Sequence, residues 1–298
     1  MALLFLLSKV QKKFSLRLTA AHLNHALQKK ASAKAEKAVK GYARSLGIPV
    51  VARTVDVRAV SRRTRRSIEE AGRNERYRFF ENTAKRLRYG TVATAHTLDD
   101  QVETALFRLI RGSGLKGLAG IPPKRAHNSV ALIRPLLWAR KKEILELLRE
   151  EGVPFVIDRT NSHMIFSRNR IRHELIPMLE EKFNAQVKSA ILNLQHIARD
   201  AHDYIETEAA RSLSRSALVR RAGGGIRFSA ARLKRLHPAL FGEVLRKAYE
   251  AHRGDLKRLT HEHIAAVSEL VHSGVRKARL SLPEGIVVSK NGPDIHIR

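Results

Sequence analysis

The feature that most constrains the fold is an alternation of strand-like and helix-like segments along residues 1–187. Short runs rich in Val, Ile and Thr alternate with longer runs whose apolar residues recur at helical spacing. We expect strands at 16–22, 47–55, 89–96 and 130–137, and helices at 32–46, within 58–88, from Leu98 and at 139–154. Strands that alternate with helices form a parallel, doubly wound sheet, so the sequence predicts an α/β fold.

The remaining part of the chain has a different pattern. From about Asn184 the segments are helical and end in a β-like tail at 278–298, and the stretch RRAGGGIRFS at 220–229 is the clearest break between them. The sequence therefore predicts two domains, an α/β domain at 1–187 and a second, mainly helical domain at 188–298.

The chain is strongly basic, with 57 Lys and Arg against 28 Asp and Glu and a net charge of +29. Such an excess serves solubility or reflects an Arg-rich background in some proteins, but it favours a polyanionic partner, here nucleic acid. The chain has no cysteine, which excludes disulfides and thiolate metal sites and suggests a reducing compartment. The opening MALLFLLSKV is too short to span a bilayer and lacks a basic n-region, so we expect a cytoplasmic protein with no membrane partner.

Ionisable residues are concentrated where the third expected strand joins its helix, in VATAHTLDDQVETALFRL. His96, Asp100 and Glu103 share one side of this helix if His96 continues the helical phase. A capping box made by Thr97 and Asp100 is the structural alternative, but it leaves His96 and Glu103 unexplained. Because ligands bind at the carboxyl ends of strands in such sheets, these residues are suited to Mg²⁺ binding or proton transfer.

Two basic segments are candidates for phosphate binding. GSGLKG at 112–117 matches a dinucleotide fingerprint literally but follows a helix, so we reject that interpretation. The loop is flanked by basic residues that suit a phosphate backbone, namely Arg111, Lys116, Lys124 and Arg125. SRNRIRHEL at 167–175 places Arg168 and Arg172 on one helix face and Arg170 on another, either as a solvated basic face or as a phosphate clamp.

Two further segments carry weaker signals. His22 and His25 end the first expected strand, where a loop or nucleotide-edge role is favoured over a metal pair. The stretch 58–78 carries eight arginines, with Tyr77 among them, and forms either a mobile surface loop or an RNA-facing one.

Taken together, these stretches resemble the tRNA(Ile)-lysidine synthases, a branch of the PP-loop ATP pyrophosphatases. The resemblance rests on LTAAHLNHAL, SIEEAGRNERYRFF, TAHTLDDQVETALFRLIRGSGLKGLAGIPP, LIRPLL, DRTN and SRNRIRHELIPML, and on the helical part with its β tail. It implies an enzyme that uses ATP and Mg²⁺ to adenylate the wobble cytidine of an isoleucine tRNA with a CAU anticodon. Free L-lysine then displaces AMP and forms lysidine. A homodimer is compatible with this picture.

The resemblance also assigns residues. It implies catalytic roles for His96, Asp100, Glu103 and Arg168, with Asp100 and Glu103 as Mg²⁺ ligands. It places ATP phosphates near His22, Arg73, Arg170 and Arg172.

The ATP loop of this family, Ser-Gly-Gly-x-Asp-Ser, corresponds to a position before Met1, so we expect an upstream segment that encodes a strand and this loop. Ala26 and Gln28 replace the Gly and Arg that are usual in the family. Two alternatives remain: a non-catalytic tRNA-binding member of the family, and another PP-loop tRNA-modifying enzyme such as a thiolase. The absence of cysteine argues against a thiolase, which needs persulfide carriers or an iron–sulfur cluster.

Overall fold

The computed structural model describes the chain except for residues 28, 156–166, 221–224, 254–255 and 257. Gln28 and the DRTN stretch at 158–161 therefore lie outside the described residues. The chain forms two compact units, Met1–His196 and Ile197–Arg298, and the division falls within helix α10 (Val187–Ser216).

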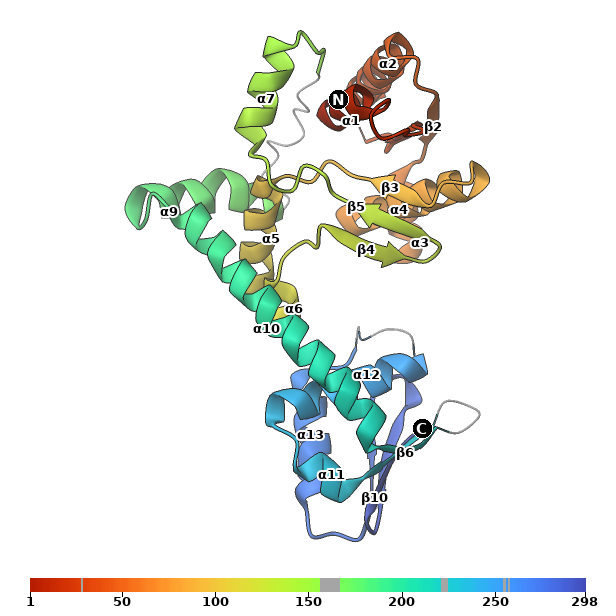
Figure 1. Cartoon of the computed structure of the whole chain (residues 1–298), viewed down its shortest axis with the longest axis vertical. Coiled ribbons are helices and arrows are strands. Elements are labelled where there is room, and N and C mark those ends of the chain that lie inside the picture. The colour runs from red at the N-terminus through yellow and green to blue at the C-terminus, as the bar shows by residue number, and fades with distance from the viewer. Residues whose placement is uncertain (28, 156–166, 221–224, 254–255, 257) are drawn as a thin grey trace. The chain divides into compact units, whose positions relative to one another are not determined.

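The first unit is the expected α/β domain (Figure 1). Strand β1 pairs in parallel with β2, strand β3 pairs in parallel with β5, and β4 pairs antiparallel with β5. Its strands are β1 (Ala20–Asn24), β2 (Val50–Thr54), β3 (Thr91–Ala93), β4 (Lys124–His127) and β5 (Val130–Ile133). Its helices before α10 are α1 (Ala2–Val10), α2 (Lys29–Ser45), α3 (Val57–Thr64), α4 (Ile68–Arg86), α5 (Leu98–Ile110), α6 (Leu115–Leu118), α7 (Lys141–Glu150), α8 (Ser167–Arg170), the π-helical turn η2 (Ile171–Leu175) and α9 (Ile176–Lys182).

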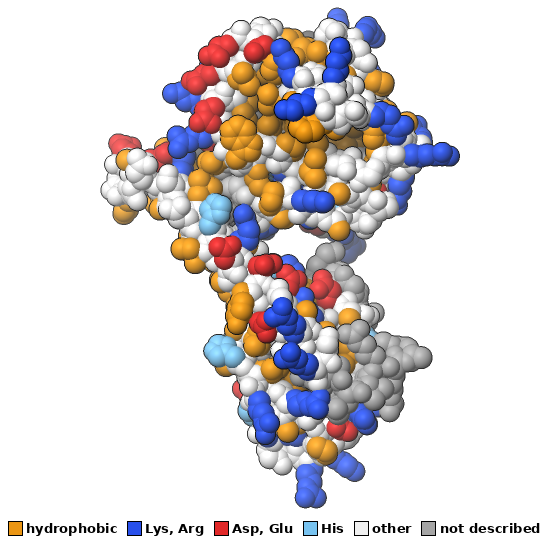
Figure 2. Space-filling view, in the orientation of Figure 1, with side chains coloured by type: hydrophobic (Ala, Val, Ile, Leu, Met, Phe, Trp, Pro, Cys, Tyr) orange, Lys and Arg blue, Asp and Glu red, His pale blue; other side chains and the backbone are white. Residues whose placement is uncertain are grey.

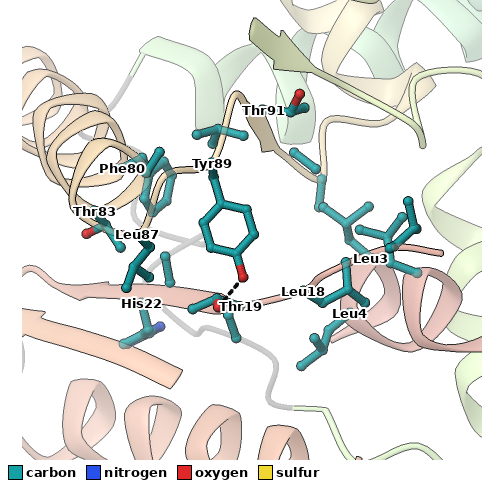
Figure 3. Close-up of a pocket in the computed structure, with 18 of the residues that line it drawn as sticks. Leu3, Leu4, Leu18, Thr19, His22, Phe80, Thr83, Leu87, Tyr89 and Thr91 are labelled. Atoms are coloured by element: carbon teal, nitrogen blue, oxygen red, sulfur yellow. Dashed lines mark hydrogen bonds between the residues drawn. The ribbon is translucent and has the colours of Figure 1, made fainter. Parts of the chain in front are cut away.

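The structure differs from the sequence predictions in two ways here. The arginine-rich stretch 58–78 is no loop, because Asp56 caps α3 and Ser67 caps α4, which makes this stretch mostly helical. The strands also form two hydrogen-bonded groups, β1–β2 and β3–β5–β4. An apolar pocket of about 430 Å³ is lined by residues of both β1 and β3, and the Tyr89 hydroxyl meets Thr19 Oγ1 there at 2.8 Å (Figure 3).

Two apolar clusters position the elements around the carboxyl ends of β3 and β5. Phe5 of α1 packs with Leu136 and with Leu148 of α7, which fixes the turn after β5. Val102 of α5 packs against Ile171, so α5 and the segment after the undescribed residues 156–166 share a buried contact. Burying these side chains stabilises each contact by roughly 1.5–3 kcal/mol per residue.

The second unit contains more strand than the sequence predicts. The segment before the β-like tail is not all helical, because β6 (Ala217–Arg220) and β7 (Ile226–Ser229) form a hairpin that pairs with the tail. The result is a five-stranded antiparallel sheet in the order β6–β7–β10–β9–β8. The other elements are α11 (Ala230–Lys234), α12 (Pro238–Arg253), α13 (His261–His272), β8 (Lys277–Ser281), the 3₁₀ turn η3 (Pro283–Gly285), β9 (Val287–Asn291) and β10 (Asp294–Ile297).

One face of this sheet builds the core of the second unit. Phe228, Val288 and Ile295 are fully buried and pack against α11, α12 and α13. Lys290 is also buried, and its ammonium group donates to the carbonyl oxygens of Leu270, Val271 and Ser273 at the end of α13. This lysine therefore satisfies carbonyl groups that the end of the helix leaves without a partner. No helix among the described residues is long and apolar enough to cross a membrane.

Candidate active site

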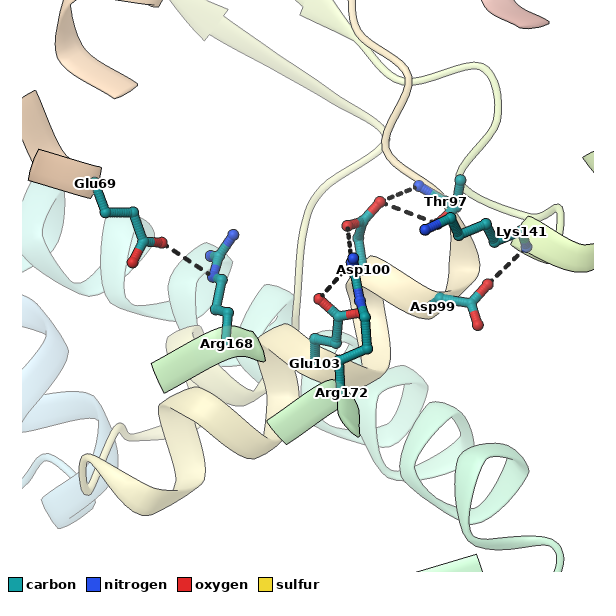
Figure 4. A network of polar contacts seen from close by, with 8 residues as sticks. All are labelled: Glu69, Thr97, Asp99, Asp100, Glu103, Lys141, Arg168 and Arg172. Carbon is teal, nitrogen blue, oxygen red and sulfur yellow. Dashed lines mark hydrogen bonds and ion pairs between the residues drawn. The ribbon is translucent and has the colours of Figure 1, made fainter. Parts of the chain in front are cut away.

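The first turn of α5 organises the site. The Asp100 carboxylate accepts hydrogen bonds from the Thr97 amide at 2.7 Å and from the Thr97 hydroxyl at 3.0 Å (Figure 4). The capping interaction considered from the sequence is thus present, and it orients Asp100. His96 differs from the expectation, because it precedes the helix and Thr97 is extended. The His96 Nδ1 atom instead meets the Thr94 hydroxyl at 2.9 Å.

Glu103 is held by an arginine 69 residues further along the chain. Its side chain is nearly buried, and Arg172 binds both carboxylate oxygens, with Nε at 2.5 Å and Nη2 at 3.0 Å. Burial raises the pKa of Glu103, while the hydrogen bond and charge of Arg172 oppose this rise. Arg172 Nη2 also lies 3.7 Å from Asp100, so one guanidinium serves both carboxylates (Figure 4). The bidentate contact with Arg172 favours the ionised form of Glu103, in opposition to the effect of burial.

His96 is a neutral imidazole in this environment. Burial is the main cause that lowers its pKa to about 4, and the charges of Arg134, Arg73 and Arg168 lower it further, whereas Asp100 opposes them. A neutral imidazole can donate one hydrogen bond and accept another. At neutral pH, His96 therefore suits the orientation of a substrate group better than the removal of a proton.

Two pairs of arginines lie over aromatic rings of the first unit, one pair over Phe107 of α5 and the other over Tyr77 of α4. Arg111 lies over the Phe107 ring at 4.0 Å and Arg168 lies over it at 5.6 Å. Arg168 also pairs with Glu69 at 3.6 Å, and its buried Nε atom has no hydrogen-bond partner among the described residues. Cation–π contacts of this kind keep a guanidinium in place while leaving its hydrogen-bond donors available.

The second pair surrounds Tyr77. Arg73 and Arg125 lie 5.0 Å and 5.5 Å from its ring centre. Burial lowers the pKa of Arg108, and the charges of Arg168, Arg73 and Arg125 lower it further. Four guanidinium groups that repel one another form a region that favours an anionic ligand.

The glycine-containing loop after α5 is firmly attached to this helix. Gln101 accepts from the Ile121 amide at 2.7 Å and donates to its carbonyl at 2.8 Å. Arg108 donates to the carbonyls of Gly117 and Gly120. Gly120 has a φ of +76°, and a Cβ there would lie 2.5 Å from Gln101 Oε1, so glycine is required. Of the four residues expected to contact phosphates here, Arg111 precedes the loop, Lys116 lies on α6, Lys124 and Arg125 lie on β4, and all four are exposed.

Other expected site residues lie apart from α5. His22 and His25 are on or just after β1, where His25 Nε2 meets Arg76 at 3.1 Å. Burial, then Arg76 and His22, lower the pKa of His25 to about 4. Arg170 is exposed and pairs with Glu174 at 3.2 Å. The described contacts do not bring these residues to the turn that carries Asp100.

The expected Mg²⁺ ligands are largely occupied by other contacts. Arg172 holds both oxygens of Glu103, and Thr97 holds one oxygen of Asp100. Among the residues that the structure describes, no group of three or more His, Cys, Asp or Glu side chains could hold a metal ion. In this arrangement the charge of Arg172 offsets that of Glu103, one of the two carboxylates expected to bind the cation.

The sequence analysis missed a buried cation close to His96. Arg134, at the carboxyl end of β5, is 4% exposed, donates to the Pro122 carbonyl at 2.6 Å and contributes to the low pKa of His96. Its sequence signal was an arginine directly after an apolar strand, in LIRPLL. Such a charge is expensive to bury without a function.

Comparison with known proteins agrees with this architecture. Residues 1–179 match the PP-loop domain model, so the chain belongs to the PP-loop family. Residues 228–292 match the TilS substrate binding domain, which confirms the resemblance stated from the sequence.

Two similar proteins share the name tRNA(Ile)-lysidine synthase. A tRNA(Ile)-lysidine synthase of Geobacter sulfurreducens is 37% identical over 93% of this chain, and one of Clostridium tetani is 30% identical over the whole of it. The chain spans 58% and 62% of the lengths of these two relatives. The U34-tRNA thiolase NcsA from Methanococcus maripaludis, with its [4Fe-4S] cluster, shares the fold, with a TM-score of 0.51 and 16% identity over 65% of this chain and 67% of that one.

Proposed function

We propose that this protein is a tRNA(Ile)-lysidine synthase that joins free L-lysine to the wobble cytidine of an isoleucine tRNA. The observation that carries the proposal is the buried Glu103–Arg172 pair beside Asp100 and a neutral His96, in a PP-loop domain followed by a TilS substrate binding domain. The relatives' name supports the substrate assignment.

The proposed reaction has two steps. The 2-carbonyl oxygen of the cytidine attacks the α-phosphorus of ATP, and pyrophosphate leaves. The lysine amine then attacks carbon 2, loses a proton and expels AMP. The first step makes a poor leaving oxygen into a good one.

The residues of this chain suit the charges in that reaction. Arg168, Arg73 and Arg108 supply fixed positive charge where the pyrophosphate and AMP oxygens gain negative charge. Arg172 contacts both carboxylates of α5, and Asp100 Oδ1, 3.7 Å from Arg172, is the carboxylate oxygen that Thr97 does not contact. Mg²⁺ would enter with the phosphates of ATP, as is usual for nucleotide-dependent enzymes.

The basic surface supports tRNA as the partner. Lys and Arg side chains are spread over the visible face of both units (Figure 2). The exposed cations in the segment that follows α5, up to β4, include Arg111, Lys116, Lys124 and Arg125. We expect tRNA affinity to fall steeply with salt, because phosphate contacts release counterions.

The direct test is ATP-dependent incorporation of labelled lysine into isoleucine tRNA by this protein. Asp100→Asn and Glu103→Gln should reduce adenylation much more than tRNA binding, since phosphates are held by arginines elsewhere. A wild-type protein that binds the tRNA but incorporates no lysine would refute the ligase proposal.

A further inference from the structure

The single tryptophan of the chain is unusually exposed. Trp138 lies between β5 and α7 and is 75% exposed. An indole buries roughly 150–250 Å² when it packs. Leaving it in water forgoes the stabilisation that packing of the ring would provide.

The backbone on both sides of Trp138 is fixed. Leu136 is 4% exposed, and its carbonyl accepts a hydrogen bond from the Ala139 amide at 3.1 Å. The Ala139 carbonyl accepts from the Leu98 amide at 3.0 Å, at the first residue of α5. The Lys141 amide donates to Asp99 at 2.7 Å (Figure 4). The indole is therefore carried by a turn that is attached to the first turn of α5.

The residues after Trp138 are basic. Arg140 and Lys141 are exposed, and among the described residues neither side chain forms an ion pair. Lys142 is exposed as well and lies 3.8 Å from Glu146, a surface pair of little strength. An exposed ring followed in sequence by exposed cations is the combination that binds single-stranded nucleic acid, since bases stack on the ring and phosphates bind the cations.

We propose that Trp138 is a stacking platform for an unpaired RNA base, with Arg140 and Lys141 binding the adjacent phosphates. The proposal rests on the proposed function in taking RNA as the substrate. The backbone next to this platform is hydrogen-bonded to the first turn of α5, which carries Asp100. Duplex RNA does not fit this platform, because the faces of its bases are already stacked on each other.

The fluorescence of the only tryptophan tests the stacking directly. The probe is an unstructured oligoribonucleotide of about ten nucleotides, within the range of known single-strand sites. We expect it to quench Trp138, whereas ATP and a duplex of the same length leave the emission unchanged. Equal quenching by duplex and single strand, or no quenching at saturation, overturns the proposal.

Substitutions test the contribution to affinity. Stacking of one base contributes roughly 1–3 kcal/mol, so Trp138→Leu should weaken single-strand binding about 5- to 150-fold, while Trp138→Phe keeps most of the affinity. Phe183→Leu is the matched control, because Phe183 is also 75% exposed but follows Glu180, Glu181 and Lys182, a segment with a net negative charge. An affinity of Trp138→Leu within twofold of that of Phe183→Leu overturns the proposal.

The two proposals fail separately. A wild-type protein that forms lysidine without quenching by the oligonucleotide retains the proposed function and loses the platform. A protein that quenches with single-stranded RNA but never forms lysidine retains the platform and loses the ligase assignment.

Discussion

Replacing Arg172 by methionine tests whether the Glu103–Arg172 pair holds the site together. Methionine keeps much of the aliphatic length of arginine and removes the charge. Glu103 is 4% exposed and has no other cation within salt-bridge distance among the described residues. The Arg172→Met variant therefore leaves a carboxylate in a low-dielectric position without its partner.

The expected loss of stability follows from the burial of the pair. Breaking a buried ion pair by removing one partner costs about 3–5 kcal/mol. The Arg172 side chain is 26% exposed, so water relieves part of the penalty and we expect about 3 kcal/mol at neutral pH. The double variant Glu103→Gln, Arg172→Met should regain at least half of this loss, because the buried charge of Glu103 is then removed as well.

The loss should depend on pH in a defined direction. The pKa of Glu103 is already raised by burial, and removing Arg172 raises it further. A carboxyl group whose pKa is higher in the folded state than in the unfolded state favours folding at low pH. This contribution disappears as the pH rises through the folded-state pKa. The destabilisation by Arg172→Met should therefore be smaller at about pH 5 than at about pH 8.

Urea-dependent hydrogen exchange of the α5 amides measures this stability within the first unit. Arg170→Met is the matched control, because Arg170 lies two positions away in an exposed pair with Glu174 that should contribute about 0–1 kcal/mol. Equal losses for Arg172→Met and Arg170→Met, or a loss that does not change with pH, would refute the reasoning.

Three other predictions concern single residues. Gly120→Ala should destabilise the first unit by roughly 1–3 kcal/mol, because φ is +76° and the new Cβ meets Gln101; chemical denaturation that shows no loss contradicts this geometry. The imidazole of His96 should titrate near its lowered pKa of about 4, which NMR of the ring protons measures; a midpoint at the ordinary value near 6.5 would contradict its burial among arginines. Lys290→Met should cost the second unit about 1–3 kcal/mol, since the carbonyl of Leu270 and its neighbours at the end of α13 lose their donor; hydrogen exchange at α13 equal to that of the wild type would argue against the cap.

Local patterns in the sequence were sufficient for the elements that carry the site. Helical periodicity and an abrupt change from apolar to acidic residues predicted that a helix begins near Leu98. Helix α5 does begin at Leu98. The alternation of strands and helices predicted the α/β class, because that order leaves few other ways to bury both faces of a sheet. These features depend on neighbouring residues, which the sequence shows directly.

Long-range pairing required the tertiary structure. Three arginines in SRNRIRHEL look alike in sequence, yet Arg172 binds Glu103, Arg168 lies over Phe107, and Arg170 faces solvent beside Glu174. The hairpin of β6 and β7 likewise became recognisable only through its pairing with the tail. The strength and partner of a charge depend on its burial and on groups distant in the chain, so spacing alone could identify the candidate residues while the folded chain decided their contacts.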